Sequence, residues 1–259
     1  MNLSVCIPVY NENSIISDTL SELYAYLADL ADKTGAEIEL IFADDGSTDG
    51  SGDTIRRDVT AKSMDKISVK VAGYAQNMGK GYAVRHGVLA STGDIVMFTD
   101  CDIAYGTDVI GRAYEVLSEN GKSDYKKIDA LIGSRNTSAD DGYYAYSKLR
   151  KILSKVYIKV LNIAAGFSLT DSQCGFKSFN GDSARRVFSL CETNGFAFDI
   201  EVIMIAQKLG YTISEMPVRV IKHGESKVRI VRDSVKMLSD IRKIKKHVRT
   251  LDKNNGGRK

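Results

Sequence analysis

The chain has 259 residues, a length that fits one large α/β domain or such a domain with a C-terminal appendage. Its hydrophobic content of 43% and charged content of 27% are ordinary for a globular protein, and a net charge of +3 is too small to indicate a nucleic-acid partner. The four cysteines are dispersed and form no C-x-x-C pair, which favours reduced thiols in a cytoplasmic protein over disulfides or zinc. No apolar run approaches the roughly 18 residues that a membrane-spanning helix requires.

In chain order, apolar runs alternate with segments of helical periodicity. A helix with apolar residues at a spacing of about 3.6 is expected from Ser14 to Ala31, and another opens at Gly79-Lys80-Gly81 and continues through Ser91. Strands are predicted at 3–9, 38–43, 67–72 and 95–98. This repeated alternation predicts an α/β fold with a doubly wound, mostly parallel sheet and helices on both faces.

Polar side chains follow each of these strands. Ligands of such sheets bind beyond the carboxyl ends of the strands, so we expect four successive loops to meet at one edge. Their polar residues are Tyr10 and Glu12, Asp44 and Asp45, Asn77 and Lys80, and Asp100 and Asp102. The glycines around Lys80 do not make a nucleoside-triphosphate loop, because Gly81 occupies the place of the required Ser or Thr. Val84 likewise breaks the dinucleotide-binding pattern.

Asp100 and Asp102 flank Cys101 directly after the buried-looking strand at 95–98. Two neighbouring carboxylates need a positive charge between them, and Mg²⁺ or Mn²⁺ held jointly with substrate phosphates is the usual solution. The alternative is that the two residues only cap the following helix.

Taken together, the motifs resemble a known family. The segments Pro8-Val9-Tyr10-Asn11-Glu12, Asp44-Asp45-Gly46-Ser47-Thr48-Asp49, Gly79-Lys80-Gly81 and Asp100-Cys101-Asp102 resemble inverting glycosyltransferases of family 2, which have the GT-A fold. Further segments are similar to the dolichyl-phosphate β-glucosyltransferase branch: Gly133-Ser134-Arg135, Asp171-Ser172-Gln173-Cys174-Gly175-Phe176-Lys177, Phe198-Asp199-Ile200-Glu201, Glu215-Met216-Pro217-Val218 and Ser226-Lys227-Val228-Arg229.

The resemblance implies roles for these residues. Pro8, Tyr10, Glu12, Asp44 and Asp45 would hold the nucleoside of a nucleotide sugar, with Asn77 and Lys80 beside them. Asp100 would lie near the ribose or the metal, and Asp102 would bind the metal that bridges the diphosphate. Ala104 stands where the mannosyl branch usually carries Gln, which favours UDP-glucose over GDP-mannose as the donor.

The second half of the chain carries cations that suit a phosphate acceptor. A polyprenyl or dolichyl phosphate is already ionised, since its second pKa lies near ~6, and it needs positive charge more than a general base. The candidates are Arg135, Lys177, Arg219, Lys227 and Arg229, with the alternative that each is a solvated surface charge. If the acceptor is instead a saccharide hydroxyl, Asp199 or Glu201 is the candidate base. A third possibility is a nucleotide-sugar-binding protein without turnover.

The C-terminal quarter is predicted to end in a long amphipathic helix. Its apolar residues recur at helical spacing from Val228 to Val248, and its polar face is rich in Lys and Arg. Such a face attracts an anionic membrane surface, which would place the protein peripherally at the cytosolic side, or it can pack on the body or on a second subunit. The predicted organisation is a domain at 1–225, with a nucleotide half at 1–105 and an acceptor half at 106–225, then the helix at 226–250 and a disordered tail at 251–259. Tyrosines and lysines at 140–166 also suit a membrane interface, or a helix packed on its own sheet.

Overall fold

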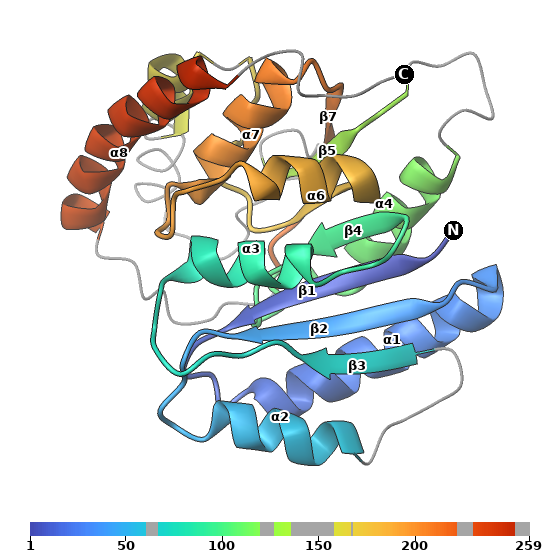
Figure 1. Ribbon diagram of the computed structural model, residues 1–259. Helices are drawn as coiled ribbons and strands as arrows, with labels where there is room; N and C mark the ends of the chain where they lie inside the picture. The colour runs from blue at the N-terminus through green and yellow to red at the C-terminus, as the bar shows by residue number, and fades with distance from the viewer. Residues whose placement is uncertain (61–66, 120–126, 136–157, 167, 222–229, 252–259) are drawn as a thin grey trace.

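The computed structural model describes residues 1–60, 67–119, 127–135, 158–166, 168–221 and 230–251, which are the coloured parts of Figure 1. At 60, 230–236 and 238 it describes the backbone alone. The predicted tail beyond residue 251, most of the predicted interface segment at 140–166, and Lys227 and Arg229 therefore lie outside the described residues.

The first half alternates strands and helices as expected. The elements are β1 (Leu3–Val9), α1 (Ile16–Thr34), β2 (Ile38–Asp44), α2 (Ser51–Thr60), β3 (Ile67–Val71), α3 (Lys80–Leu89) and β4 (Ile95–Phe98). Helix α1 extends three residues beyond its predicted end, because Gly35 takes the left-handed conformation that closes a helix (φ 71°). The Gly35 amide donates to the Ala31 carbonyl at 2.8 Å, so the last turn is capped from within.

The second half contributes a strand that runs against its neighbours. Its elements are α4 (Asp108–Ser118), β5 (Ala130–Ser134), β6 (Lys177–Asn180), α6 (Gly181–Ser189), α7 (Phe198–Lys208), β7 (Ile213–Pro217) and α8 (Ile230–Thr250), with a further helical segment at 158–165. The seven strands lie in the order β3-β2-β1-β4-β6-β5-β7. Strand β6 is antiparallel to both β4 and β5, whereas the other pairings are parallel. The beginning of β6 therefore lies at the edge where β4 and β5 end.

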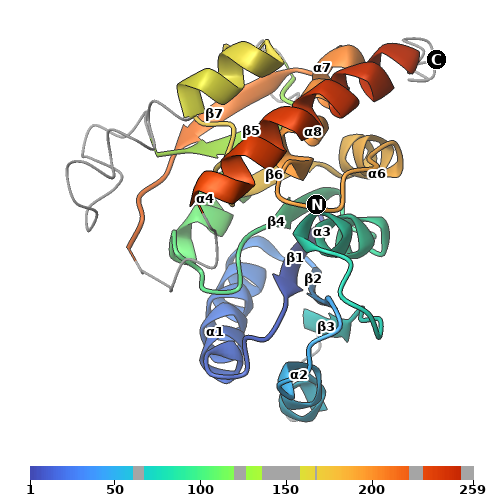
Figure 2. The same ribbon diagram turned by 90° about the vertical axis from the view of Figure 1, so that its left-hand side faces the viewer.

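Helices cover both faces of this sheet, as Figure 2 shows with α1 and α4 on one side and α3 and α6 on the other. The face toward α1 and α4 is packed with aliphatic side chains such as Leu20, Leu27 and Val109. The opposite face has an aromatic centre, in which the Phe98 ring lies 5.8–6.5 Å from the rings of Phe179, Phe188 and Phe198. Burial of these large side chains on both faces drives the sheet and its helices together.

Helix α8 packs on the second of these layers. Its buried residues Met237, Ile241, Ile244 and Val248 belong to the same hydrophobic cluster as the aromatic centre, and Figure 2 shows the helix crossing outside α7. Among the residues that the structure describes, none of the helices is both long and apolar enough to cross a bilayer.

Candidate active site

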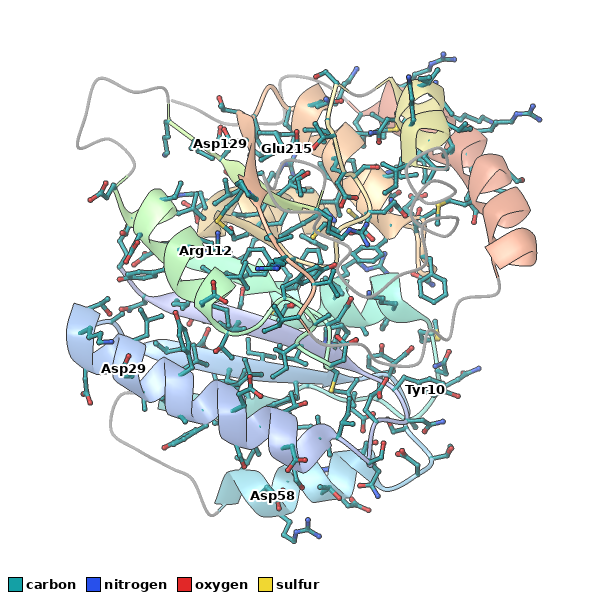
Figure 3. The ribbon with its side chains drawn as sticks, turned by 180° about the vertical axis from the view of Figure 1, so that it is seen from behind. Tyr10, Asp29, Asp58, Arg112, Asp129 and Glu215 are labelled. Atoms are coloured by element: carbon teal, nitrogen blue, oxygen red, sulfur yellow. The ribbon has the colours of Figure 1, made fainter. Side chains whose placement is uncertain are left out.

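The loops after β1, β2 and β4 meet at the carboxyl edge of the sheet, near Tyr10 on the right of Figure 3. The loop at 10–13 is tied to the loop after β2: the Asn11 amide donates to Ser47 Oγ at 3.0 Å, and the Glu12 amide donates to Ser51 Oγ at 2.9 Å. Tyr10 is 41% exposed, and Pro8 lies within β1 opposite Ala43. The predicted nucleoside-binding loops are thus joined to each other by hydrogen bonds.

Asp44 and Asp45 are both buried, and each holds backbone amides. Asp44 accepts from the Ser47 amide at 3.0 Å. Asp45 accepts from the Tyr74 hydroxyl at 2.8 Å and from the amides of Met78 and Gly79 at 2.6 and 2.9 Å. Asp45 therefore fixes the segment that leads to Lys80 and carries the exposed Asn77.

Asp100 and Asp102 lie at the centre of the edge, and Lys80 forms an ion pair with Asp100. The Lys80 ammonium is 2.5 Å from Oδ1 of Asp100, with about a quarter to a third of both side chains exposed (26% and 31%). Burial lowers the pKa of Lys80, but the charges of Asp100 and Asp199 outweigh it and the pKa is raised. The pKa of Asp102 is raised, first by burial and then by the charges of Asp100 and Glu12. The Ala104 amide, which donates to Asp102 at 3.2 Å, and the charge of Lys80 lower it by less. The local excess of negative charge attracts cations.

These carboxylates fit a divalent ion of the Mg²⁺ or Mn²⁺ type. Both supply hard oxygen ligands, and such ions are commonly held by one or two carboxylates together with substrate phosphates. Within the described ranges, no group of three or more His, Cys, Asp or Glu side chains is arranged to hold a metal by itself. Two carboxylates leave most positions of such an ion to other oxygen ligands, such as those of a diphosphate.

The glycines beside Lys80 serve packing between the two halves of the chain. A Cβ at Gly79 would lie 2.6 Å from the Asn194 carbonyl oxygen, and a Cβ at Gly81 would lie 2.5 Å from that of Thr193. The Gly81 amide donates to the Asn194 carbonyl at 2.8 Å, and the Tyr82 amide does so at 3.3 Å. The amino end of α3 is therefore capped by the loop before α7, which brings Lys80 to the acceptor half.

Lys177 and Asp199 form a buried ion pair behind this edge. The Lys177 side chain is fully buried, and its ammonium contacts Asp199 Oδ1 and donates to the Cys174 carbonyl at 2.7 Å. Burial raises the pKa of Asp199 against the opposing charges of Lys177 and Lys80. The charge of Asp199 thus acts on both lysines, and Lys177 lies beneath the surface rather than on it.

Glu201, the other predicted base, is 1% exposed. It accepts from the amides of Glu192 and Thr193 at 3.1 and 2.7 Å, so its carboxylate holds the loop that caps α3.

The segment 170–176 links Arg135 to Asp100. Arg135 donates to the buried Asp171 through Nε (2.6 Å) and Nη2 (2.9 Å), a bidentate pair. Burial raises the pKa of Asp171, but Arg135 outweighs it and the pKa is lowered. At the other end, the Gly175 amide donates to the Tyr105 hydroxyl at 3.1 Å, and Gly175 lies directly against the Asp100 carboxylate. Arg135 is thereby brought into the same network as Asp100.

Of the remaining predicted cations, Arg219 is exposed on the stretch that follows β7. That stretch is positioned by the Val218 amide, which donates to the Ser134 carbonyl at 3.0 Å, and by the Ile221 amide, which donates to the Ala104 carbonyl at 2.8 Å.

Some residues of this network were not identified as site residues from the sequence. Tyr74 and Tyr105 had no signal beyond their position after a strand or an acidic motif. Glu215 lies in a segment that carried the resemblance but had no assigned role; its carboxylate accepts from the Thr170 and Asp171 amides.

Comparison with known proteins finds relatives over most of the chain. The family model for glycosyl transferase family 2 matches residues 4–188. A dolichyl-phosphate β-glucosyltransferase of Saccharomyces cerevisiae is 32% identical over 250 residues, covering 92% of this chain and 72% of its own. One of Dictyostelium discoideum is 30% identical over 248 residues, covering 94% and 73%.

Among solved structures, glucosyl-3-phosphoglycerate synthase of Mycobacterium tuberculosis, crystallised with Mn²⁺, UDP and glucosyl-3-phosphoglycerate, superposes with a TM-score of 0.62. It is 18% identical and covers 97% of this chain and 81% of its own. The same protein was also crystallised with Mg²⁺ and UDP. The likeness confirms the expected GT-A fold. The family model and the curated relatives show that this chain belongs to glycosyltransferase family 2.

Proposed function

We propose that this glycosyltransferase moves glucose from UDP-glucose to a polyprenyl phosphate of the dolichyl type, with inversion at the transferred carbon. The observation that carries the proposal is the similarity to dolichyl-phosphate β-glucosyltransferases over more than nine tenths of the chain. The solved structure with UDP and Mn²⁺ supports the choice of nucleotide and metal.

The state of the carboxylates favours a phosphate over a hydroxyl acceptor. A saccharide hydroxyl needs a general base within hydrogen-bond reach. Asp199 is bound to Lys177, and Glu201 is engaged by two backbone amides. A phosphate monoester oxygen is ionised near neutral pH and attacks without a base. The second reading, transfer to a saccharide hydroxyl, therefore lacks a ready base in these two residues.

On the donor side we assign Asp100 and Asp102 to a divalent ion, which when bound would neutralise charge on the leaving diphosphate. Lys80 is assigned to the diphosphate as well. Tyr10, with Pro8 and Glu12, and Asn77 are assigned to the nucleoside. Asp45 holds the segment on which Asn77 lies, and Asp44 holds the amide of Ser47, whose hydroxyl accepts from the Asn11 amide.

On the acceptor side we assign Arg135 and Arg219 to the phosphate, together with Lys227 and Arg229. Arg135 is preorganised by its bidentate bond to Asp171, which reduces the cost of reorganisation during transfer. Lys177 and Asp199 act together: the buried lysine orients the carboxylate, whose charge also raises the pKa of Lys80.

We also propose that α8 contacts the cytosolic face of a membrane. Its exposed Arg242, Lys243, Lys246 and Arg249 form a basic face, and Ile163 of the neighbouring helical segment is 71% exposed. Each basic residue near an anionic surface contributes about 1 kcal/mol. The double variant Lys246→Glu/Arg249→Glu should lose co-sedimentation with phosphatidylserine vesicles. The charge-matched control Lys33→Glu/Arg57→Glu, on α1 and α2, should retain it; equal binding by both variants would contradict the membrane contact.

The activity is tested by incubating the protein with Mn²⁺, radiolabelled UDP-glucose and polyprenyl phosphate. Label in the organic phase that disappears in Asp102→Ala and on chelation supports the proposal. Label on saccharide alone supports the hydroxyl acceptor, and UDP-glucose binding without transfer supports a binding protein. Replacing UDP-glucose with GDP-mannose, UDP-galactose or UDP-N-acetylglucosamine in the same assay identifies the sugar.

A further inference from the structure

Glu215 lies on β7, the last strand of the sheet, and its carboxylate holds the start of the segment 170–176. Oε1 accepts from the Thr170 amide at 2.9 Å, from the Thr170 hydroxyl at 2.8 Å and from the Asp171 amide at 3.1 Å, and Oε2 accepts from the Thr170 amide at 3.1 Å. A carboxylate that accepts several amides at once restrains that backbone strongly, because charge-assisted hydrogen bonds are about twice as strong as neutral ones.

The restraint reaches the side chains to which the transfer reaction is assigned. Asp171, whose amide Glu215 binds, is the partner of Arg135. Four residues further along, Gly175 lies against the Asp100 carboxylate, and its amide is fixed by the Tyr105 hydroxyl. If the start of the segment moves, Arg135 therefore moves with its partner Asp171, and Asp100 is displaced through its contact with Gly175.

We propose that Glu215 is a positioning residue for glycosyl transfer, which sets the segment 170–176 so that Arg135 and Asp100 hold their places. It does not contact the reacting atoms. This inference rests on the proposed function, in which Arg135 faces the acceptor phosphate and Asp100 the metal–diphosphate.

The chain offers a matched control at the other end of the same pair of strands. Asp129, directly before β5, is buried and accepts from the Thr212 amide, directly before β7, at 2.9 Å. Both carboxylates are labelled in Figure 3. Loss of Asp129 also removes a carboxylate that holds a backbone amide, but at the edge away from Asp100.

The experiment compares Glu215→Ala, Glu215→Gln and Asp129→Ala, each at a temperature where circular dichroism shows it fully folded. We expect Glu215→Ala to lower kcat and the affinity for UDP with Mn²⁺, measured by calorimetry, each by about tenfold, the equivalent of about 1.4 kcal/mol. Glu215→Gln keeps an acceptor oxygen for the Thr170 and Asp171 amides and should recover most of both losses. Asp129→Ala should lower Tm while kcat and UDP affinity stay within about twofold of wild type.

Unchanged UDP affinity and kcat in Glu215→Ala, or equal losses in Asp129→Ala, would refute the positioning role. So would a Glu215→Gln variant as impaired as Glu215→Ala. If Glu215→Ala does not fold, Thr170→Val, which removes the 2.8 Å hydroxyl bond to Glu215 together with the 2.6 Å bond to Ser134 Oγ, should show a smaller loss in the same direction, and no loss would overturn the proposal. A wild-type protein that binds UDP but does not label polyprenyl phosphate would refute the proposed acceptor, while the UDP-affinity comparison would still decide the role of Glu215.

Discussion

Replacing Gly175 with alanine tests how closely the acceptor half must approach Asp100, the carboxylate proposed to bind the metal. A Cβ at this position would lie 2.9 Å from Cγ of Asp100 and closer still to its Oδ2, whereas ordinary contacts begin at 3.4 Å. The φ angle of Gly175 is outside the positive range, so alanine meets no backbone strain there and the contact alone is tested. Relief requires Asp100, or the segment at 175, to move by about 1 Å, and overpacking of this kind costs about 1–3 kcal/mol.

The displacement should affect the reaction more than the fold. Asp100 is 2.5 Å from Lys80, so its movement also disturbs that ion pair. A misplacement of about 1 Å in a reacting group can reduce the rate by about 100-fold. For a chain of this size, the loss of stability corresponds to a fall in Tm of about 3–10 °C.

The assay is the initial rate of glucosyl transfer, together with the affinity for UDP in the presence of Mn²⁺. Gly195→Ala is the control, because a Cβ at residue 195 meets no atom within 4 Å and its φ is also outside the positive range. We expect a large loss in Gly175→Ala and almost none in Gly195→Ala. Transfer by Gly175→Ala at the wild-type rate, with unaltered UDP affinity, would show that Asp100 does not need its present position.

Three further predictions concern charged groups. Burial raises the pKa of Glu39, but bonds from Lys70, Ser4 and Thr92 outweigh it and lower the pKa to about 2. The contribution of Glu39 to the free energy of unfolding is therefore full above its ordinary pKa of 4.5 and is lost as the pH falls toward 2. Urea titrations at several pH values should show this loss in wild type and not in Glu39→Gln. Parallel curves of unfolding free energy against pH would contradict it. Lys177→Met should lower the free energy of unfolding, measured by denaturant titration, by about 3–5 kcal/mol, because it leaves the Asp199 charge buried without its partner. The double variant Lys177→Met/Asp199→Asn should recover part of that loss, and no recovery would argue against the buried pair. Arg135→Lys cannot make the bidentate bond to Asp171, so kcat/KM for transfer should fall about tenfold with little change in Tm; an unchanged value would exclude Arg135 from the acceptor site.

The parts of the fold that follow from local pattern were predictable from the sequence. The bounds of β1 and β4 are as expected, because short apolar runs beside turn residues define buried strands. The reversed strand β6 was not predicted: it lies between β4 and β5, and nothing in the four residues Lys177–Asn180 reveals their direction.

The candidate site, too, could be predicted only in part from the sequence. The edge on which Asp100 and Lys80 meet follows from the rule that parallel strands end together. The burial of Lys177 could not be predicted, because a lysine is normally solvated and its partner Asp199 is 22 residues away. The bond between Glu215 and Thr170 joins residues 45 apart and depends on where β7 lies in the sheet. Such long-range partners follow from topology, which periodicity does not specify.

The central position of β6 makes the nucleotide half and the acceptor half of the chain physically interdependent. A fragment ending at residue 105 would leave one side of β4 without its ladder partner and would remove the Asn194 carbonyl from the amino end of α3. An open apolar strand edge invites aggregation. Recombination between relatives at the boundary of the halves pairs β4 of one parent with β6 of the other, and should therefore yield fewer soluble chimeras than exchanges that keep both strands from one parent.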